Sequence, residues 1–545
     1  MKERKGISRR TFVIGAAVAG TAVAGSSLLA ACKASRRNNF QFYVNEPAYI
    51  DPYNLQESEG TKVGSQLFDS LLDYDYKTEK LVPAAAESWT VSPDATVFTF
   101  KLREGATFHN GDPVTAADFK RGWERICNPN VSADPSEISY HLAQVKGYKE
   151  MFEDGTATEL SGVKAIDELT FEVTLSEPYG DFIYVITHPA LAPVPAAADD
   201  FDSFIDAPIG NGPFMMEGKW VHDQYIRTKR FEGYYGDVPI VEGVDFNIIS
   251  EVDTAFQEFK AGNLDFARIA DGQIDICIEE YGEAGDGYTA QPGKQVMIGP
   301  ESSTYYIIMN NKDPQLKNVK LREAISYAIN RQAICDTVFM GTRNPADGLI
   351  PPGIAGYRQG AWKTAVYDVD KAKAALAEAG YPGGQGLANI KLSYNTGGSH
   401  EAIMQLIAGD LKAIGIETTL DSMEWAAYLD ALAAGTIQMG RLGWIADYPI
   451  MENFLFSLFY TNNGDNYSFY SNPDVDKQIM SSRGITNDAE RIRSFQAVDD
   501  IIQESTPIAP IMFYKHADIT SSRVNDFYYA PNLIADLAHT WLTLE

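Results

Sequence analysis

Cysteine is scarce in this chain, with only four residues in 545. That number is too small for the disulfide framework that holds small secreted domains together. Basic residues are also outnumbered, because 45 lysine and arginine residues stand against 74 aspartate and glutamate residues, a formal net charge of −29. Binding to nucleic acid requires a basic surface that neutralises phosphates, so this balance argues against a nucleic-acid partner.

The sequence also lacks the short motifs of the common enzyme classes. It has no two histidines four residues apart, no phosphate loop ending in Gly-Lys-Ser/Thr, and no Gly-x-Ser-x-Gly turn. Its seven histidines occur singly along the chain. We therefore predict that the protein is not an enzyme and needs no metal or other cofactor. The abundance of carboxylates is the only support for the alternative, a secreted hydrolase.

Long apolar runs are absent after residue 31, since no later stretch reaches the roughly 18 uninterrupted apolar residues of a membrane-spanning helix. Residues 1–31 are different, with five basic residues against one acidic residue ahead of an apolar run from Phe12 to Ala31. This pattern is typical of a signal peptide. The alternative is an uncleaved membrane helix, because about 20 apolar residues can just span a bilayer.

Two features inside this segment refine the prediction. Arg9 and Arg10 resemble the twin-arginine export signal. Residues 29–32, Leu-Ala-Ala-Cys, resemble the bacterial lipobox, in which the cysteine is diacylated and becomes the new N-terminus. Because two acyl chains give stable anchoring, we expect Cys32 to tether the protein through residues 32–39 to the outer face of the cell membrane, the periplasmic side if an outer membrane exists.

The rest of the chain has the composition of a folded protein, with 45% hydrophobic, 12% aromatic and 22% charged residues. Its length suggests about three or four domains. Alternation of apolar and polar residues predicts strands over 97–102 and 169–175, and helical spacing predicts helices over 319–339, 368–379 and 400–414, the last followed by a strand over 416–420. The chain is therefore a mixed α/β protein. One pair among Cys127, Cys277 and Cys335 could form a disulfide, but the sequence does not indicate which.

Several longer motifs are more specific. Residues 81–89 read Leu-Val-Pro-Ala-Ala-Ala-Glu-Ser-Trp, and residues 98–119 read as a strand, a glycine-containing turn and a helix with Thr115 as its N-cap. Further matches are Asn-Gly-Pro-Phe at 211–214, residues 319–331, Ala-Gly-Tyr-Pro at 379–382, and Gly-Trp-Ile-Ala-Asp-Tyr-Pro at 443–449. In this order they cover nearly all of the mature chain. It resembles the extracellular solute-binding proteins of family 5, and within them the oligopeptide-binding lipoproteins of peptide ABC importers.

The resemblance implies a periplasmic-binding-protein-like fold of class II, cluster C, with two α/β lobes and an extra inserted domain. Lobe I would comprise residues 40–60, 190–302 and 512–545, the inserted domain II residues 61–189, and lobe III residues 303–511. A monomer of this family encloses an extended oligopeptide between its lobes and delivers it to the permease subunits of an ABC transporter. Main-chain hydrogen bonds and hydrated side-chain pockets accept peptides of many sequences.

The same resemblance assigns candidate ligand-binding residues. Asp447 occupies the position whose carboxylate meets the α-ammonium group of the peptide; the alternative is that it caps a turn before Tyr448 and Pro449. Breaking a buried pair of this kind costs about 3 to 5 kcal/mol, so Asp447 would dominate affinity. The other candidates are Glu46 and Ala48 near the first strand, Trp425, Arg441, Gly443 and Trp444 at pocket positions, and Tyr140, where the spacing is irregular. Either tryptophan fits a core position equally well.

The chain also departs from the pattern of the family. Leu432 stands where some members have an arginine that can meet a peptide carboxylate, which leaves recognition of the peptide C-terminus and peptide length open. Ile445 replaces a cysteine that forms a disulfide in some relatives. Other ligands of the same fold remain alternatives, namely a nickel complex, haem, an opine, a sugar or a signalling peptide, and so does a sensing or adhesion role without transport.

Overall fold

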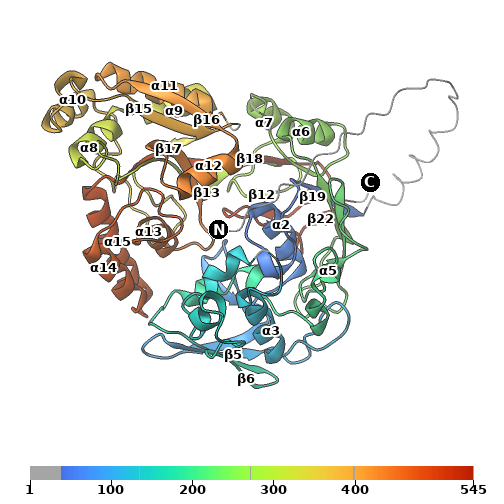
Figure 1. The fold of residues 1–545 in the computed structure, drawn as a ribbon. Helices are drawn as coiled ribbons and strands as arrows, with labels where there is room; N and C mark the ends of the chain where they lie inside the picture. Colours follow the sequence, from blue (N-terminus) through green and yellow to red (C-terminus); the bar gives the residue numbers. More distant parts are fainter. Residues whose placement is uncertain (1–37, 134, 271, 397–398, 544–545) are drawn as a thin grey trace, which may run out of the picture.

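The computed structural model describes residues 38–133, 135–270, 272–396 and 399–543. In Figure 1 most elements drawn from yellow to red lie on one side of the molecule, and most blue and green elements lie on the other, together with the last strands β19 (Val524–Asn525) and β22 (Trp541–Leu542). The predictions for residues 1–31 and for Cys32 fall outside the described residues. Within the described ranges, no helix is long and apolar enough to cross a membrane.

The first sheet lies in the blue and green half and has the strand order β1-β10-β9-β8. Its strands are β1 (Asn39–Val44), β10 (Gly243–Ile248), β9 (Tyr225–Arg230) and β8 (Phe214–Met216). Strand β1 alternates, and it buries Phe40, Phe42 and Val44 on one face. The ring of Phe42 stacks on that of Phe266 with centroids 4.5 Å apart, which ties this sheet to the seven-stranded sheet that contains β11 (Phe266–Arg268).

A second four-stranded sheet has the order β4-β5-β7-β6, with all neighbours antiparallel. It consists of β4 (Ala86–Val91), β5 (Val97–Leu102), β7 (Thr170–Thr174) and β6 (Val163–Asp167), and helix α3 (Ala116–Cys127) packs against it. The two strands predicted from alternation are thus confirmed as β5 and β7. Thr115 precedes α3 as predicted, and both its backbone N–H and its hydroxyl donate to Asp118, at 2.9 and 2.7 Å.

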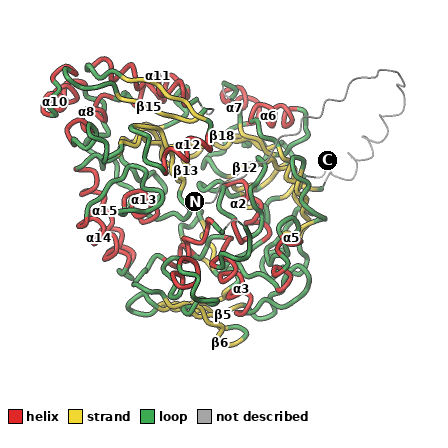
Figure 2. Tube along the Cα trace, in the orientation of Figure 1, coloured by secondary structure: helices red, strands yellow, loops and turns green. Residues whose placement is uncertain are grey.

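The largest sheet has the order β11-β18-β13-β17-β15-β16, with β14 added to β18. Its strands are β11 (Phe266–Arg268), β18 (Ile508–Thr520), β13 (Val296–Met309), β17 (Met439–Ile445), β15 (Ile390–Asn395), β16 (Thr418–Met423) and β14 (Asn344–Pro345). Helices α8 (Val319–Ala328), α9 (Arg331–Phe339), α10 (Val369–Glu378) and α11 (His400–Ala413) lie around its β15 end, as Figure 2 shows. The helices α12 (Trp425–Ala433), α13 (Met451–Phe459), α14 (Pro473–Arg483) and α15 (Asp488–Glu504) complete this half.

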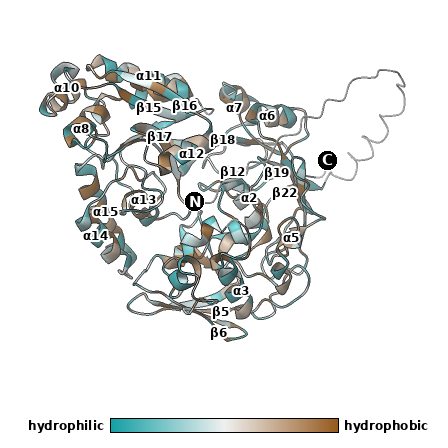
Figure 3. Cartoon of the chain, in the orientation of Figure 1, coloured by the Kyte–Doolittle hydropathy of each residue, from teal (hydrophilic) through white to brown (hydrophobic). Residues whose placement is uncertain are grey.

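The remaining elements are shorter. Helices α2 (Ser58–Leu67), α5 (Phe201–Phe204), α6 (Val252–Lys260) and α7 (Ile274–Tyr281) belong to the blue and green half. The remaining short strands are β2 (Leu72–Asp75), β3 (Lys80–Pro83), β12 (Thr289–Ala290), β19 (Val524–Asn525), β20 (Phe527–Tyr529), β21 (Ala535–Asp536) and β22 (Trp541–Leu542). In Figure 3 outer helices such as α11 and α15 carry both hydrophobic and hydrophilic residues, as expected of helices with one buried face.

The prediction of one continuous helix over residues 319–339 is wrong. Residues 319–339 form two helices, α8 and α9, because the backbone leaves the helical region at Ile329 and Asn330. The Asn330 side chain accepts a hydrogen bond from the N–H of Ala333 at 3.0 Å and so starts the second helix. The helices predicted over 368–379 and 400–414 are confirmed as α10 and α11, and the strand predicted over 416–420 begins two residues later, as β16.

The apolar core is divided into separate groups of buried side chains. One group surrounds α3 and includes Phe98, Phe171 and Trp123. The others surround the β1 sheet and α6 on one side, and the helices α8 to α15 on the other. Cys127, Cys277 and Cys335 are all buried and free, so no disulfide forms among the described residues.

Strands β13 and β18 connect these groups. Val296 and Ile519 at one end of the pair are buried with α6, whereas Ile307 and Ala509 at the other end are buried with α8 and α11. Their antiparallel register shifts between Pro300 and Thr304, at the point where the pair passes from one group to the other. Such a bulge bends a strand, and the two long strands connect the halves through this irregularity.

Candidate functional site

A cavity of about 460 Å³ lies between the two halves of the molecule. The lining residues on the β1 side are Tyr43, Asn45, Phe266, Arg268 and Tyr529, and those on the β17 side are Arg441, Leu442, Gly443 and Ile445. Its volume falls within the range of small-ligand sites in proteins. Strand β17 therefore runs along one wall of a cavity whose opposite wall belongs to a different part of the fold.

Opposite charges meet inside this cavity. The Arg268 guanidinium lies 3.5 Å from a carboxylate oxygen of Glu301 and 3.5 Å from one of Asp518. The other carboxylate oxygen of Asp518 is buried and has no hydrogen-bond partner among the described residues. Burial raises the pKa of Tyr43, on the same wall, to about 12. The cavity thus offers both an acceptor and a phenol donor to a polar ligand.

Asp447 lies two residues beyond the end of β17. Its Oδ2 accepts hydrogen bonds from the side-chain amide of Asn453 at 2.9 Å and from the Tyr140 hydroxyl at 3.4 Å. Asn453 also orients this segment, because its Oδ1 accepts from the Asp447 backbone N–H at 3.2 Å and from the Trp444 indole N–H at 2.9 Å. Sequence reasoning missed Asn453, which is buried at the start of α13.

The charge of Asp447 has no counter-charge in the described part of the chain. No lysine, arginine or histidine forms an ion pair with it there. Burial raises the pKa of Asp447 to about 6, the bond from Asn453 opposes this shift, and the nearby carboxylate of Asp465 adds to it. An ionised carboxylate in this setting favours a cationic partner.

Two predicted residues of β17 line the cavity. Arg441 is only 8% exposed and donates from Nε to Asn395 Oδ1 at 2.6 Å. Gly443 pairs with Tyr305 of β13, and a Cβ at this position would lie 2.9 Å from the Tyr514 hydroxyl. Trp444 is half-buried, with its indole N–H directed to Asn453.

The other predicted residues lie elsewhere. Glu46 binds His222, with Oε1 2.8 Å from Nδ1, and its Oε2 accepts from the backbone N–H of Asp223 at 2.9 Å. The exposed Ala48 donates its N–H to Glu57 at 3.1 Å. Neither Glu46 nor Ala48 lines the cavity between the halves. Trp425 is the first residue of α12.

Tyr140 comes from the distant segment Glu137–Leu142, and 44% of its surface is exposed although its hydroxyl reaches Asp447. Several cavity residues escaped the sequence analysis, namely Tyr43, Arg268, Glu301, Asp518 and Tyr529. They are far apart in sequence and stand in no motif. Leu432, which stands where some family members have an arginine, is buried in the core around α12 to α15.

Comparison with known proteins identifies the family. The family model described as bacterial extracellular solute-binding proteins, family 5 Middle, matches residues 80–466. The chain belongs to family 5 of the extracellular solute-binding proteins. This membership confirms the predicted two-lobe periplasmic-binding-protein fold and the extracytoplasmic location. It also confirms the prediction that the protein is not an enzyme, since the family consists of binding proteins of transport systems.

Individual relatives align with almost the whole length of this chain. It is 29% identical to the periplasmic oligopeptide-binding protein OppA of Escherichia coli K12, with 96% of each chain covered. It is 28% identical to the glutathione-binding protein GsiB of the same organism, covering 93% of this chain and 95% of the relative. The crystal structure of Haemophilus influenzae OppA in complex with RPPGFSPFR is 26% identical, with a TM-score of 0.74 over 92% of this chain and 99% of that one.

Proposed function

We propose that this protein captures extended oligopeptides in the cleft between its lobes and delivers them to the permease subunits of an ABC transporter. The observation that carries the proposal is Asp447, a half-buried carboxylate two residues beyond β17 that Asn453 holds in place. It lies outside the lining of the 460 Å³ cavity but follows directly on the strand that forms one wall of it. A peptide supplies the missing cation in its α-ammonium group. Relatives named for oligopeptide binding, one of them solved with a nonapeptide, support this ligand class.

The remaining contacts of the peptide follow from the cavity. An extended peptide satisfies its main-chain groups by pairing with strand-like backbone, and Gly443 leaves room for close approach. Arg441 supplies a cation to the polar face of the ligand, and we assign Trp444, Trp425 and Tyr140 to contacts with the side chains of the peptide. Glu46 and Ala48 lie outside the cavity lining, so we assign them no direct ligand contact; Glu46 instead holds the segment after the first strand against His222.

We assign the lobes as residues 40–60, 190–302 and 512–545 for lobe I, 61–189 for the inserted domain and 303–511 for lobe III. The separate groups of buried side chains support this division except near its first boundary, where Val63, Leu67 and Phe68 are buried with the β1 sheet of lobe I. The mature protein is a monomer tethered through diacylated Cys32, after export directed by Arg9 and Arg10 and removal of residues 1–31. Mass measurement of the membrane-extracted protein tests the lipid, and a Cys32→Ala variant should be released from the membrane.

Titration calorimetry with trialanine and with N-acetyl-trialanine tests the site. We expect trialanine to bind and the acetylated peptide to bind at least about a hundredfold more weakly, because it lacks the cation. Asp447→Asn should weaken trialanine binding by a similar factor. The matched control is Asp430→Asn on α12, an exposed residue of the same lobe, which should bind trialanine like the original protein.

Equal affinity for free and acetylated peptide would contradict the role of Asp447. Failure of every peptide to bind would contradict the ligand class. Glutathione belongs in the same titration, because a relative of similar identity is named for glutathione binding and glutathione carries a free α-ammonium group. If the protein bound glutathione and no other peptide, the proposed ligand would be glutathione instead of oligopeptides in general.

A further inference from the structure

The residues that follow Asp447 are divided between the two halves of the molecule. Tyr448 and Ile450 are buried in the group of apolar side chains around α3, whose other buried members come from residues 55–191. Met451 is buried in the group around α12 to α15. The short segment after Asp447 is therefore anchored both in the proposed inserted domain and in proposed lobe III.

Glu452, in the first turn of α13, receives hydrogen bonds from both halves. Its Oε2 accepts from the hydroxyl of Tyr179 at 2.9 Å and from the hydroxyl of Tyr448 at 3.1 Å. Its Oε1 accepts from Nε of Arg483, the last residue of α14, at 2.7 Å. All four side chains are buried. A buried carboxylate bound in this way by separate segments fixes those segments relative to one another.

The two phenols serve Glu452 as hydrogen-bond donors. Burial, together with the charge of Glu452, raises the pKa of Tyr179 and of Tyr448 well above the ordinary value of a phenol. Both hydroxyls therefore keep their protons at neutral pH and donate them to the carboxylate. The Arg483 guanidinium also lies 4.2 Å from the centroid of the Tyr179 ring, so the ring is held as well as its hydroxyl.

This network meets the proposed ammonium site at two points. Tyr448 directly follows Asp447 in the chain, and Asn453 directly follows Glu452. Asn453 donates to the carboxylate of Asp447 at 2.9 Å and accepts from its backbone N–H at 3.2 Å. A displacement of Tyr448, or of the first turn of α13, would therefore move the Asp447 carboxylate relative to the amide that holds it.

We propose that Tyr179 and Tyr448 are positioning residues for peptide recognition, which through Glu452 hold the Asp447 carboxylate where it meets the α-ammonium group. Because this role depends on the ammonium contact of Asp447, it rests on the proposed function. It gives the inserted domain, through Tyr179, a part in recognising the free amino end of the peptide. Neither phenol needs to contact the ligand, since both act through the segment 447–453.

Phenylalanine at either position removes the hydroxyl and keeps the ring. Tyr179→Phe and Tyr448→Phe each leave Glu452 bound to the other phenol and to Arg483. Glu452→Gln is less suitable, because the buried guanidinium of Arg483 would lose its counter-charge and folding would suffer. Titration calorimetry with trialanine measures one affinity, and the same titration in the presence of N-acetyl-trialanine gives the weaker affinity by competition.

We expect Tyr179→Phe and Tyr448→Phe each to weaken trialanine binding about tenfold, because a hydrogen bond to a charged group is lost from the support of Asp447. Binding of N-acetyl-trialanine should stay nearly the same, because this peptide has no ammonium group to be positioned against. The ratio of the two dissociation constants should therefore fall about tenfold. A merely structural defect, such as partial unfolding, would weaken both peptides equally and leave this ratio unchanged.

A double-mutant cycle tests whether the phenols act through Asp447. In the Asp447→Asn background, Tyr448→Phe should have no further effect on trialanine binding, since the carboxylate that it positions is gone. Asp181→Asn provides a contrast, because it breaks the pair with Arg491 instead. It should weaken both peptides by the same factor and leave the ratio as it is in the original protein.

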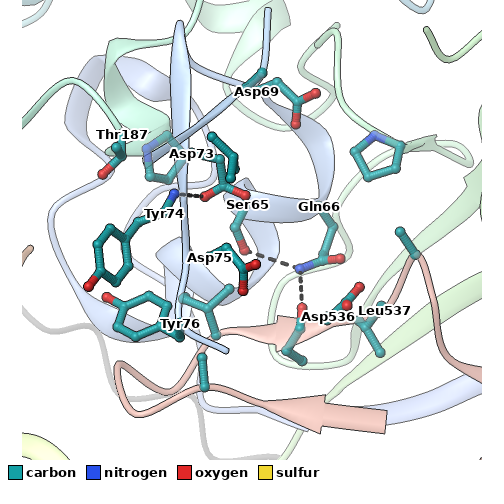
Figure 4. A pocket seen from close by; sticks show the side chains of 18 of the residues that line it. Ser65, Gln66, Asp69, Asp73, Tyr74, Asp75, Tyr76, Thr187, Asp536 and Leu537 are labelled. Carbon is teal, nitrogen blue, oxygen red and sulfur yellow. Dashed lines mark hydrogen bonds between the residues drawn. The ribbon is translucent and has the colours of Figure 1, made fainter. Parts of the chain in front are cut away.

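Tyr148→Phe is the matched control. Tyr148 is also buried, and its hydroxyl lies 3.2 Å from that of Ser139, within the proposed inserted domain. Tyr74→Phe is a second control, because Tyr74 lines a separate cavity of about 580 Å³, shown in Figure 4. Among the described residues, none lines both this cavity and the cleft. Both control variants should bind trialanine and N-acetyl-trialanine like the original protein.

An unchanged ratio in Tyr179→Phe and Tyr448→Phe would overturn the positioning role, whether or not both affinities fall together. Additive effects of Asp447→Asn and Tyr448→Phe on trialanine binding would overturn it as well. Equal affinity of the original protein for the free and the acetylated peptide would be a different failure, because it contradicts the ammonium contact of the proposed function and the positioning role with it.

Discussion

At the scale of single residues, Asp447 is the residue to which we assign peptide recognition, and Asn453 holds it in place. Asn453 holds three groups at once, the carboxylate and N–H of Asp447 and the indole of Trp444. The motif around residues 443–449 was enough to single out Asp447, Gly443 and Trp444. Asn453 could not be found in the same way, because its role depends on where α13 begins relative to β17.

The pH dependence of peptide affinity follows from Asp447. The pKa of this carboxyl is raised to about 6, mainly by burial, and only its ionised form pairs with an ammonium group, which keeps its proton below about pH 7. Trialanine affinity should therefore fall by about tenfold between pH 7 and pH 5. Calorimetry across this range measures the change. Affinity that stays constant or rises toward pH 5 would contradict the assignment, and Asp447→Asn should lack the dependence.

At the scale of elements, α3 is joined to the first segment of the chain by a buried ion pair. Arg125 donates from Nη1 to Asp51 Oδ1 at 2.7 Å and from Nη2 to Oδ2 at 2.6 Å, and both side chains are buried. The guanidinium also lies 5.3 Å from the ring centroids of Tyr53 and Phe201. Asp51 belongs to proposed lobe I and Arg125 to the inserted domain, so the pair fixes one to the other.

Breaking this pair from one side should be costly. Asp51→Asn is expected to lower the free energy of unfolding by about 3 to 5 kcal/mol, because it leaves a buried guanidinium without its counter-charge. Asp51→Asn combined with Arg125→Met should cost less, since no charge then remains buried. Denaturant unfolding of the ligand-free protein measures both.

The matched control is Glu232→Gln, which removes one partner of the exposed Arg230–Glu232 pair. A surface pair contributes about 0 to 1 kcal/mol, so this variant should unfold almost like the original protein. Equal effects of Asp51→Asn and Glu232→Gln would show that burial of the first pair has no energetic importance.

Helices and strands were easier to predict from the sequence than the tertiary contacts between them. Alternation identified β5 and β7, and glycine at 380 and 415 correctly ended the helices before them. The break at Asn330 escaped prediction because apolar spacing continues through it. There Arg331 turns inward and donates to the carbonyls of Pro510 and Ser326, so tertiary contacts with β18 and α8 decide where the helix stops.

At the scale of the whole molecule, the segment 179–181 of the proposed inserted domain also contacts the half built on α13 to α15. Arg491 of α15 lies 2.5 Å from Asp181, and both are buried. Nearby, the Tyr179 hydroxyl donates to Glu452 Oε2 at 2.9 Å, and the N–H of Gly180 donates to the carbonyl of Arg483 at 2.5 Å. These contacts span the two sides that β13 and β18 connect.

Loss of the contact across the halves should favour a more open molecule. Asp181→Asn is expected to increase the radius of gyration in solution scattering and to weaken trialanine binding, because only a fraction of the molecules then has the binding geometry. Asp488→Asn is the control, since Asp488 also pairs with Arg491, at 2.6 Å, but lies on the same helix. If Asp488→Asn opened the molecule as much as Asp181→Asn, the contact between halves would not hold it closed.

The amino-acid sequence was enough to predict the family, the mixed α/β class, several strands and helices, and Asp447 as a candidate, because each depends on local periodicity or on a contiguous motif. The cleft, the partners of Asp447 and the free state of the three described cysteines became visible only in three dimensions. The cleft and the bond from Tyr140 to Asp447 join residues hundreds of positions apart. Packing in three dimensions, which no local pattern encodes, brings them together and removes the water that would otherwise screen their charges.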